Sequence, residues 1–329
     1  YVIKNPAGWI PDEFVNAYAG GAVIKGLSPI LVIADQPPLG KYLIGLSALI
    51  FNNENFVILF AGTVSFLFLY LIGRQIYSHK ILAFLPLVFL SFEPLILNQF
   101  VYVPLLDIIQ LSLILPSFYF FNKGLSEKAK KQFFYFSLSS ILLGCFISTK
   151  FFITGLTVMA AFYLVLIYQK KWKTIAPLIL SNIFVVLVLM LSYLKVFLDG
   201  EGLRRFFGIQ KWIFLYHKSQ LILPFTIWPL ILFNRWYVWY GDKPVISDFQ
   251  WQITWPIVFL GSLLTIFLYF IKKIPKKPEF EVLGIWTICY LLFFSFGQIT
   301  ARYLIIYLPV LYLVTLFGLE NFIFKKRKI

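Results

Sequence analysis

Two short polar motifs near the N-terminus combine residues that can move a proton and hold a negative charge. Asp12 and Glu13 form an acidic pair, and the run QPPLGK follows from Gln36 to Lys41. A carboxylate within hydrogen-bond reach of a hydroxyl can remove its proton, and a preorganised cation can stabilise an anion that develops nearby. The two motifs therefore predict a catalytic loop.

Each motif also has a local explanation that involves no chemistry. Asp12 can cap a helix that begins after a proline, and it can do so while still presenting Glu13. Pro37 and Pro38 enforce an extended approach to a helix that carries Lys41 in its first turn. A lysine is at the unfavourable end of the helix dipole there, which favours an anionic partner for Lys41.

The composition determines the setting of this loop. Hydrophobic residues make up 60% of the chain, charged residues make up 13%, and the mean hydropathy is +0.84. A soluble domain has about 25% charged residues, whereas several segments here approach the ~20 apolar residues that cross a bilayer. The sequence therefore predicts an all-α polytopic membrane protein, with spans at residues 56–77, 81–98, 103–122, 132–148, 151–169, 174–197, 255–272, 280–298 and 303–323.

The net charge of +15 follows these spans and does not indicate nucleic-acid binding. With the N-terminus outside, the inner loops and the C-terminal tail hold 17 of the 29 basic residues but only 4 of the 14 acidic ones. This is the positive-inside pattern, which sets orientation. It predicts a cytoplasmic C-terminus and partners that are membrane lipids rather than nucleic acid.

The same topology predicts one domain over residues 1–329, with outer loops at 1–55 and 198–254. Nine spans and a cytoplasmic C-terminus place Tyr1 outside. We therefore expect an earlier span before Tyr1 that carries the chain across the membrane. The expected location is the cell membrane, or the endoplasmic reticulum in a eukaryote, with the active site on the extracytoplasmic face. No oligomeric state follows from the sequence.

The second outer loop carries a regular basic pattern. Arg204, Lys211 and Lys218 recur every seven residues, which places them on one face of a helix. The pattern fits an interfacial amphipathic helix, and it also fits a basic face that guides an anionic lipid head group. The chain has two cysteines, both within predicted spans, and two histidines without metal-ligand spacing, so no metal site is predicted.

Ionisable residues gather near the outer ends of the predicted spans. They are Glu93, Asp107, Lys150, Lys195 and Arg302. Charges inside hydrocarbon are costly and mark functional sites, so we expect them to converge with the two N-terminal motifs just beneath the outer surface. Locally, the basic side chains can instead extend to the interface, and the two carboxylates can cap neighbouring helices.

The order of these motifs resembles that of the protein O-mannosyltransferases, membrane glycosyltransferases of the GT-C fold, and more distantly that of the lipid A aminoarabinose transferases. The matching motifs are Asp12-Glu13, QPPLGK with Gln36 where the family has His, Leu105-Leu106-Asp107, Ser148-Thr149-Lys150 with Phe151-Phe152 and Gly155, and Trp228-Pro229 with Trp236-Tyr237. Val101-Tyr102 stands where the family usually has Ser-Arg, which leaves the sugar and the acceptor open.

This resemblance implies transfer of a sugar, mannose in the family, from a dolichyl- or polyprenyl-phosphate carrier to an acceptor hydroxyl such as a protein Ser or Thr, with inversion. Asp12 is then the expected general base and Glu13 its neighbour that orients the acceptor. Lys41, Lys150 and Arg302 are expected at the donor phosphate, supported by Gln36, Pro37, Pro38, Glu93 and Asp107. The resemblance implies no cofactor beyond the lipid-linked donor.

Three other interpretations fit part of the sequence. The same chemistry can act on a lipid or glycan acceptor. A transporter or flippase for lipid-linked or anionic solutes would also be polytopic, but it would predict internal repeats and charges near the bilayer midplane, and the sequence has neither. An inactive homologue would keep the fold without the reaction.

Overall fold

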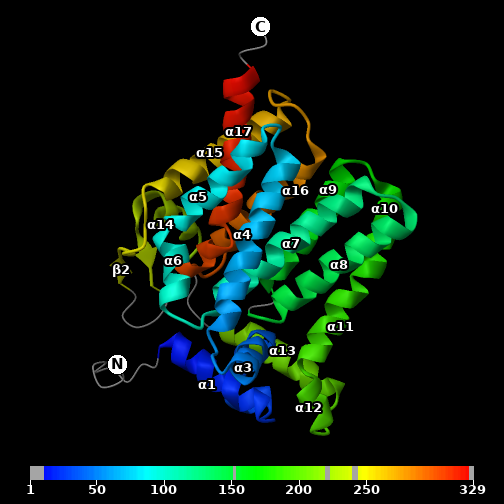
Figure 1. The fold of residues 1–329 in the computed structure, drawn as a ribbon, viewed down its shortest axis with the longest axis vertical. Coiled ribbons are helices and arrows are strands. Elements are labelled where there is room, and N and C mark those ends of the chain that lie inside the picture. The colour runs from blue at the N-terminus through cyan, green and yellow to red at the C-terminus, as the bar shows by residue number, and fades with distance from the viewer. Residues whose placement is uncertain (1–10, 151–152, 219–222, 239–243, 326–329) are drawn as a thin grey trace.

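The chain is a helical bundle with a cap of shorter helices at one end (Figure 1). The computed structural model describes residues 11–150, 153–218, 223–238 and 244–325. Phe151-Phe152 of the Ser-Thr-Lys motif and the side chain of Lys218 lie outside that description.

In chain order the elements are α1 (Asp12–Ile24), α2 (Pro29–Val32), α3 (Leu39–Phe51), α4 (Phe56–Ile76), η2 (Lys80–Phe84), α5 (Leu85–Ser91), α6 (Pro94–Val101), α7 (Leu106–Ser126), α8 (Ala129–Ile147), α9 (Ile153–Tyr168), α10 (Trp172–Ser181), α11 (Ile183–Ser192), α12 (Leu194–Leu198), α13 (Leu203–Lys218), α14 (Ile227–Phe233), β1 (Trp236–Tyr237), β2 (Val245–Ile246), α15 (Thr254–Phe270), α16 (Pro278–Ser295), η3 (Ala301–Ile305) and α17 (Leu308–Lys325).

The predicted all-α class is confirmed. Within the described residues the strands are limited to β1 and β2, an antiparallel pair in which Trp236 faces Ile246. The helix α7 lies inside the bundle and packs on α4, α8 and α16. Its interior position explains why it carries the buried polar residues Gln110, Ser117 and Asn122, which pair with neighbouring helices instead of facing lipid.

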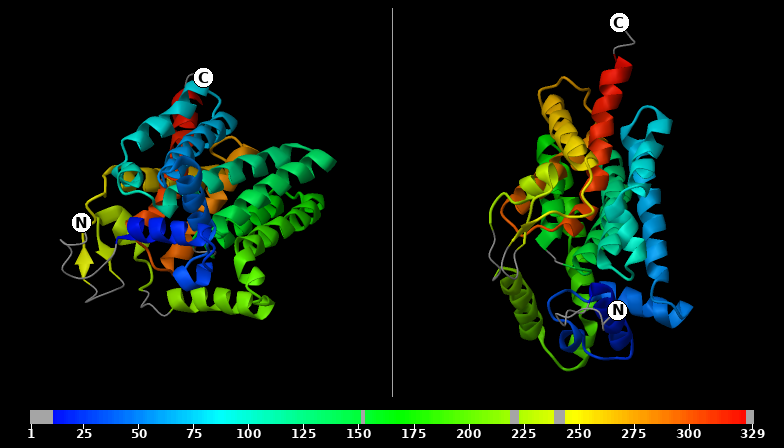
Figure 2. Two further views of the ribbon diagram at one scale, coloured as in Figure 1. Left: turned by 60° about the horizontal axis from the view of Figure 1, so that its bottom comes forward. Right: turned by 90° about the vertical axis from the view of Figure 1, so that its left-hand side faces the viewer.

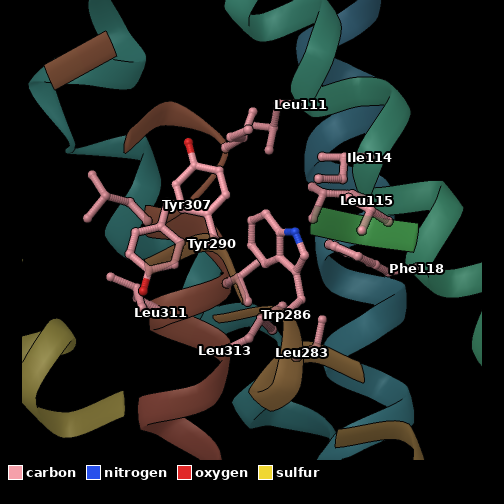
Figure 3. Packing of buried hydrophobic residues seen from close by; sticks show 14 of the residues in the cluster. Leu111, Ile114, Leu115, Phe118, Leu283, Trp286, Tyr290, Tyr307, Leu311 and Leu313 are labelled. Carbon is pink, nitrogen blue, oxygen red and sulfur yellow. The ribbon is translucent and has the colours of Figure 1, made fainter. Parts of the chain in front are cut away.

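Aromatic rings form the centre of the core. Figure 3 shows Trp286 and Tyr290 of α16 beside Tyr307, with Phe118 of α7 to the right of the indole. The rings of Tyr290 and Tyr307 stack with centroids 4.7 Å apart, and Trp286 lies 5.0 Å from Tyr290. All three side chains are fully buried. Such rings bury large apolar areas, and they hold α16 and α17 against the start of η3, which carries Arg302.

The long helices satisfy membrane-span criteria only in part. Among the described residues, Phe56–Ile76, Trp172–Ser192 and Pro278–Ser295 are long and apolar enough to cross a bilayer, and the bent pair Lys80–Ser91 and Pro94–Val101 would make a fourth span. Three other predicted spans are shorter apolar helices, Ile153–Tyr168, Thr254–Phe270 and Leu308–Phe322. The chain is therefore a membrane protein by its helices, while the nine-span topology stays a prediction.

One predicted span is wrong as a continuous helix. The segment predicted at 81–98 is divided into η2 and α5 on one side and α6 on the other, with a bend of 63°. The break falls at Glu93, and Pro94 occupies the first position of α6. A proline has no backbone N–H and fixes its own φ, so it starts a new helix more readily than it continues an old one.

The N-terminal helices and α13 form the cap. Figures 1 and 2 show α1, α3 and α13 together at the end of the bundle opposite the C-terminal end of α17. α1 and α3 approach closely because Gly20 and Gly45 face each other. A Cβ on Gly45 would lie 2.3 Å from the carbonyl oxygen of Gly20, so only glycine fits at this contact.

Candidate active site

The acidic pair opens the first described helix. α1 begins at Asp12 with Pro11 as its N-cap, and no side chain caps it, so Asp12 does not serve as the cap. Its carboxylate instead accepts a hydrogen bond from Nη1 of Arg302, which is 290 residues away in the chain. Both side chains are partly exposed. The structure therefore joins Asp12 of the first predicted motif to Arg302 in η3, shortly before the last helix.

Arg302 connects this carboxylate to a second, buried one. Its Nε and Nη2 donate to Oδ2 of Asp107 at 3.1 and 2.8 Å. Lys150 donates to the other oxygen, Oδ1, of the same carboxylate. Asp107 is 2% exposed and Lys150 is 12% exposed, so the screening by water is small and the charge pairs are strong. Two carboxylates and two cations thus form one continuous chain.

Local structure holds these groups in place. Arg302 lies in η3, and the backbone on either side is fixed because Trp236 donates to the carbonyl of Ile299 at 2.9 Å and Tyr290 donates to that of Tyr303 at 2.6 Å. The ammonium of Lys150 lies 5.1 Å from the ring centroid of Tyr303, in a cation–π contact.

The QPPLGK run packs against the turn that carries Lys150. The backbone N–H of Leu39 donates to the carbonyl of Ser148 at 2.9 Å. Gly40 allows this approach, because a Cβ there would lie 2.6 Å from Leu106 and 2.9 Å from Thr149. Pro37 and Pro38 are buried in the turn that precedes α3.

Lys41 follows in the first turn of α3 and is buried. Its Nζ donates to Oε1 of Gln36 at 2.8 Å. Burial lowers the pKa of Lys41 to about 7, an effect that nearby Asp35 opposes and Lys150 reinforces. Gln36 therefore separates Lys41 from the cavity. Because the pKa of Lys41 is near 7, its ammonium is only partly protonated at neutral pH.

A cavity of about 400 Å³ lies at the centre of these motifs. Its lining residues come from α1, the segment before α3, the starts of α7 and η3, the Lys150 turn and α13. They are Asp12, Val15, Asn16, Val32, Ile33, Ala34, Asp35, Gln36, Leu106, Lys150, Trp212, Tyr216 and Arg302. A smaller space of about 20 Å³ lies beside the Asp107, Lys150 and Arg302 cluster, against Gln110, Tyr290 and Tyr303. It has room for about one water molecule.

The electrostatics of the two cavity cations differ. Burial lowers the pKa of Lys150, and the neighbouring Arg302 lowers it further, while Asp107 opposes both. The carboxylates of Asp107 and Asp12 raise the pKa of Arg302 against the effect of burial. Arg302 is therefore a permanent charge, whereas the charge of Lys150 depends on its pairing with Asp107.

Glu13, Glu93 and Lys195 line neither the cavity nor the smaller space beside it. Glu13 is in the first turn of α1 but is not among the lining side chains. Glu93 is at the break before α6, where it accepts hydrogen bonds from Trp255 Nε1 at 2.9 Å and Tyr312 at 3.4 Å. Lys195 pairs with Asp199 four residues later on an exposed surface.

The structure also adds four residues that the sequence did not single out. Asn16 lies one turn after Asp12 on α1 and donates to the carbonyl of Pro104 at 3.2 Å. Asp35 directly precedes Gln36. Trp212 and Tyr216 come from α13, which the sequence predicted for its basic spacing alone. The four-residue spacing from Asp12 to Asn16, and from Trp212 to Tyr216, places each pair on one face of its helix, but it does not by itself indicate a cavity.

The described residues hold no group of three or more His, Cys, Asp or Glu side chains arranged for a metal ion. The sequence predicted that the protein needs no metal ion, and that independence stays a prediction.

This arrangement of charges suits a reaction in which a group is transferred to an acceptor and an anion departs. One carboxylate at the cavity edge can accept a proton, and two cations nearby can hold a phosphate. Because the cations line the same cavity as Asp12, the acceptor and the leaving group would meet in one space.

Comparisons with known proteins agree with this geometry. A model of the family described as dolichyl-phosphate-mannose-protein mannosyltransferase matches residues 35–193, which include QPPLGK, Asp107 and Lys150 but neither Asp12 nor Arg302. A comparison with curated protein sequences finds no match. The resemblance inferred from the motifs is confirmed over the matched residues.

The fold is similar to that of ArnT from Cupriavidus metallidurans. The crystal structure of ArnT in the apo state aligns with a TM-score of 0.67 at 14% identity, covering 94% of this chain and 55% of ArnT. The structure of ArnT bound to undecaprenyl phosphate aligns with a TM-score of 0.69 at 14% identity, covering 95% of this chain and 56% of ArnT. The chain thus spans a little over half the length of ArnT, and the GT-C-type fold is confirmed.

Proposed function

We propose that this protein is a membrane glycosyltransferase that moves a sugar from a polyprenyl-phosphate carrier to an acceptor hydroxyl. The observation that carries the proposal is that Asp12, Lys150 and Arg302 line one cavity of about 400 Å³. The match to the mannosyltransferase family and the likeness to a structure of ArnT bound to undecaprenyl phosphate support a lipid-phosphate donor.

The donor phosphate would bind to Arg302 and Lys150. Arg302 is forked and permanently charged, which suits two hydrogen bonds to phosphate oxygens. Lys150 adds a second cation at the same wall of the cavity. Lys41 lies behind Gln36 and contributes through its charge rather than by contact. Asp107 keeps both cavity cations in place through the pairs already described.

Donor binding would also release the base. In the structure the carboxylate of Asp12 is bonded to Nη1 of Arg302. A phosphate that takes over this guanidinium leaves Asp12 without its cation and at the cavity edge. A carboxylate that has lost a cationic partner is the stronger proton acceptor. Asp12 is thereby active when the donor is present, and Glu13, the next residue of α1, would orient the acceptor.

The reaction then follows a single displacement. The acceptor oxygen attacks C1 of the sugar while its proton passes to Asp12. The bond from C1 to the phosphate oxygen breaks, and its electron pair leaves with the lipid phosphate, which Arg302 and Lys150 stabilise. Attack from the side opposite the phosphate inverts the anomeric centre. We propose mannose as the sugar and a protein Ser or Thr as the acceptor, on the basis of the matched family description.

A lipid or glycan acceptor is the second candidate. The likeness to ArnT, a lipid A aminoarabinose transferase, favours it, because the same fold is found with a non-protein acceptor. Both candidates use the same donor site and the same base.

The test is transfer of radiolabelled mannose from polyprenyl-phosphate mannose to a Ser/Thr-rich peptide, with full-length protein and the variant Asp12→Asn. The expected result is transfer by the wild type and loss of transfer in Asp12→Asn, while the variant still binds the lipid donor. Unchanged transfer by Asp12→Asn would overturn the role of the base. Labelled lipid or glycan product without peptide product would favour the second candidate.

A further inference from the structure

The helix α13 presents two stacked aromatic rings to the cavity. Trp212 and Tyr216 are four residues apart on this helix, and both line the cavity together with Asp12, Lys150 and Arg302. Their ring centroids are 5.3 Å apart with an angle of 19° between the planes. The indole of Trp212 is 46% exposed. A large apolar surface therefore faces the space that the charged residues enclose.

The adjoining face of α13 fixes this position. Phe206, Ile209 and Ile213 are buried and pack against Tyr193 and Val196 of the neighbouring segment around α12. Their spacing of three, four and seven residues defines one helical face. Because that face is anchored in a small core of its own, the rings at 212 and 216 are held at the cavity by the packing of the whole helix.

Anchoring in the membrane interface is the plain explanation for aromatic residues on such a helix. It accounts for Phe207 and Phe214, which are 64% and 41% exposed and are not among the cavity-lining residues. It does not account for Trp212 and Tyr216, which line a polar cavity with two carboxylates and two cations. The exposed rings of α13 thus fall into two groups with different surroundings.

We propose that Trp212, stacked on Tyr216, is the platform on which the sugar ring of the lipid-linked donor lies. A pyranose has an apolar face of C–H bonds and a rim of hydroxyls, and an aromatic ring with its negative π-face complements the C–H face. This assignment rests on the proposed function, and it adds a sugar subsite to the phosphate subsite.

The remaining lining residues suit the hydroxyl rim. Asp35 supplies carboxylate oxygens that accept hydrogen bonds, and Asn16 supplies an amide. Lys150 and Arg302 would hold the phosphate that is bonded to C1. A cavity of about 400 Å³ is in the size range of small-ligand pockets, with room for one sugar and its phosphate. Trp212 and Tyr216 would therefore bind the sugar, while Lys150 and Arg302 would bind the phosphate that every polyprenyl-phosphate lipid carries.

The test compares two lipids that differ only in the sugar. Binding of mannosyl-phospho-polyprenol and of polyprenyl phosphate is measured for full-length wild type, Trp212→Ala, Trp212→Phe and the control Phe207→Ala, which changes an exposed ring on the same helix away from the cavity. We expect Trp212→Ala to weaken binding of the sugar-bearing lipid by about tenfold relative to the bare lipid phosphate. Trp212→Phe should restore most of the loss, and Phe207→Ala should bind both lipids like the wild type.

Each other outcome has a definite meaning. Equal loss for both lipids in Trp212→Ala, or the same loss in Phe207→Ala, would show a structural or anchoring role and would overturn the proposal. Unchanged binding of both lipids with a raised KM for the acceptor would also overturn it, and would place the acceptor on the rings. Wild type that binds neither lipid would instead overturn the proposed function itself.

Discussion

Buried carboxylates at the two ends of the molecule have different partners. At the cavity, Asp107 is paired with two cations, Lys150 and Arg302. At the other end of the bundle, Glu320 of α17 accepts hydrogen bonds from the backbone N–H groups of Ser78 and His79, both at 2.8 Å. Both side chains are nearly inaccessible to water.

The polar partners of Glu281 in α16 follow the pattern of Glu320 rather than that of Asp107. It accepts from the hydroxyl of Tyr269 and from Nε2 of Gln169, each at 2.7 Å. Neutral donors satisfy a buried carboxylate without adding a charge that a ligand could claim. Cations beside an open cavity differ from neutral donors, because they can release one anion and bind another. Burial alone therefore does not distinguish these carboxylates, and it is the charged partners at a cavity that set the proposed site apart.

Removal of the shared cation should have the largest effect. Arg302→Gln takes away the group that bonds both Asp12 and Asp107, and we expect the rate of sugar transfer to fall roughly 100- to 1000-fold. The measurement is initial transfer rate at saturating acceptor. The matched control is Lys195→Gln, which breaks the exposed pair with Asp199 and should change the rate less than twofold. A similar loss in both variants would contradict the distinction between cavity and surface charges.

Removal of the buried anion should affect stability most. Asp107→Asn leaves Lys150 and Arg302 without their common carboxylate, and breaking a buried pair in this way costs about 3–5 kcal/mol in the free energy of unfolding. Thermal unfolding of the purified protein in detergent measures the loss. Replacing Lys150 with Met at the same time removes one of the uncompensated charges, so the double variant Asp107→Asn/Lys150→Met should be more stable than Asp107→Asn alone. Equal stability of the two variants would contradict the charge-pair explanation.

The lysine behind the cavity should give the site a pH dependence. Burial lowers the pKa of Lys41 to about 7 from its usual 10.5. The cost of burying its charge is fully present below pH 7 and is relieved as the pH rises from 7 toward 10.5, so stability from this group increases across that window. Binding of an anionic donor needs the charge, so affinity for polyprenyl phosphate should fall by a few-fold above about pH 7.

Binding of polyprenyl phosphate to wild type and to Lys41→Met between pH 6 and 9 tests this dependence. The variant should show weaker binding and should lack the step near pH 7. A step of the same size in Lys41→Met would assign the pH dependence to another group, such as Lys150.

Much of this arrangement was predictable, and what was not has a physical cause. Hydropathy predicted the long helices of the bundle, since a long apolar run is identifiable by itself. The motifs predicted Asp12, Lys150 and Arg302 as charges at one end of the chain's spans. The bond from Arg302 to Asp12, and the bonds of Arg302 and Lys150 to Asp107, depend on how segments far apart in sequence pack. Trp212 gave no signal because aromatic residues in an outer loop fit the membrane interface equally well.

The break at Glu93 was missed for a related reason. A hydropathy run continues across a kink, and only Pro94 marked the change of direction. The location of Glu93 near the outer end of a predicted span suggested a place beside the catalytic motifs. The structure gives it Trp255 and Tyr312 as partners, because the bend turns α6 away and points this carboxylate at α15 and α17.

The smallest effect is therefore expected for Glu93→Gln, and it tests the comparison most sharply. Glu93 was predicted to support the catalytic site, yet Trp255 and Tyr312, which donate to it, are neutral, as are the donors to Glu281. A glutamine keeps one oxygen acceptor for Trp255 Nε1, so we expect a loss of about 1 kcal/mol in the free energy of unfolding and less than a threefold change in transfer rate. Thermal unfolding and initial rates measure the two quantities. A large loss of transfer with little loss of stability would place Glu93 in the chemistry after all, and neutral partners would no longer distinguish structural carboxylates from functional ones.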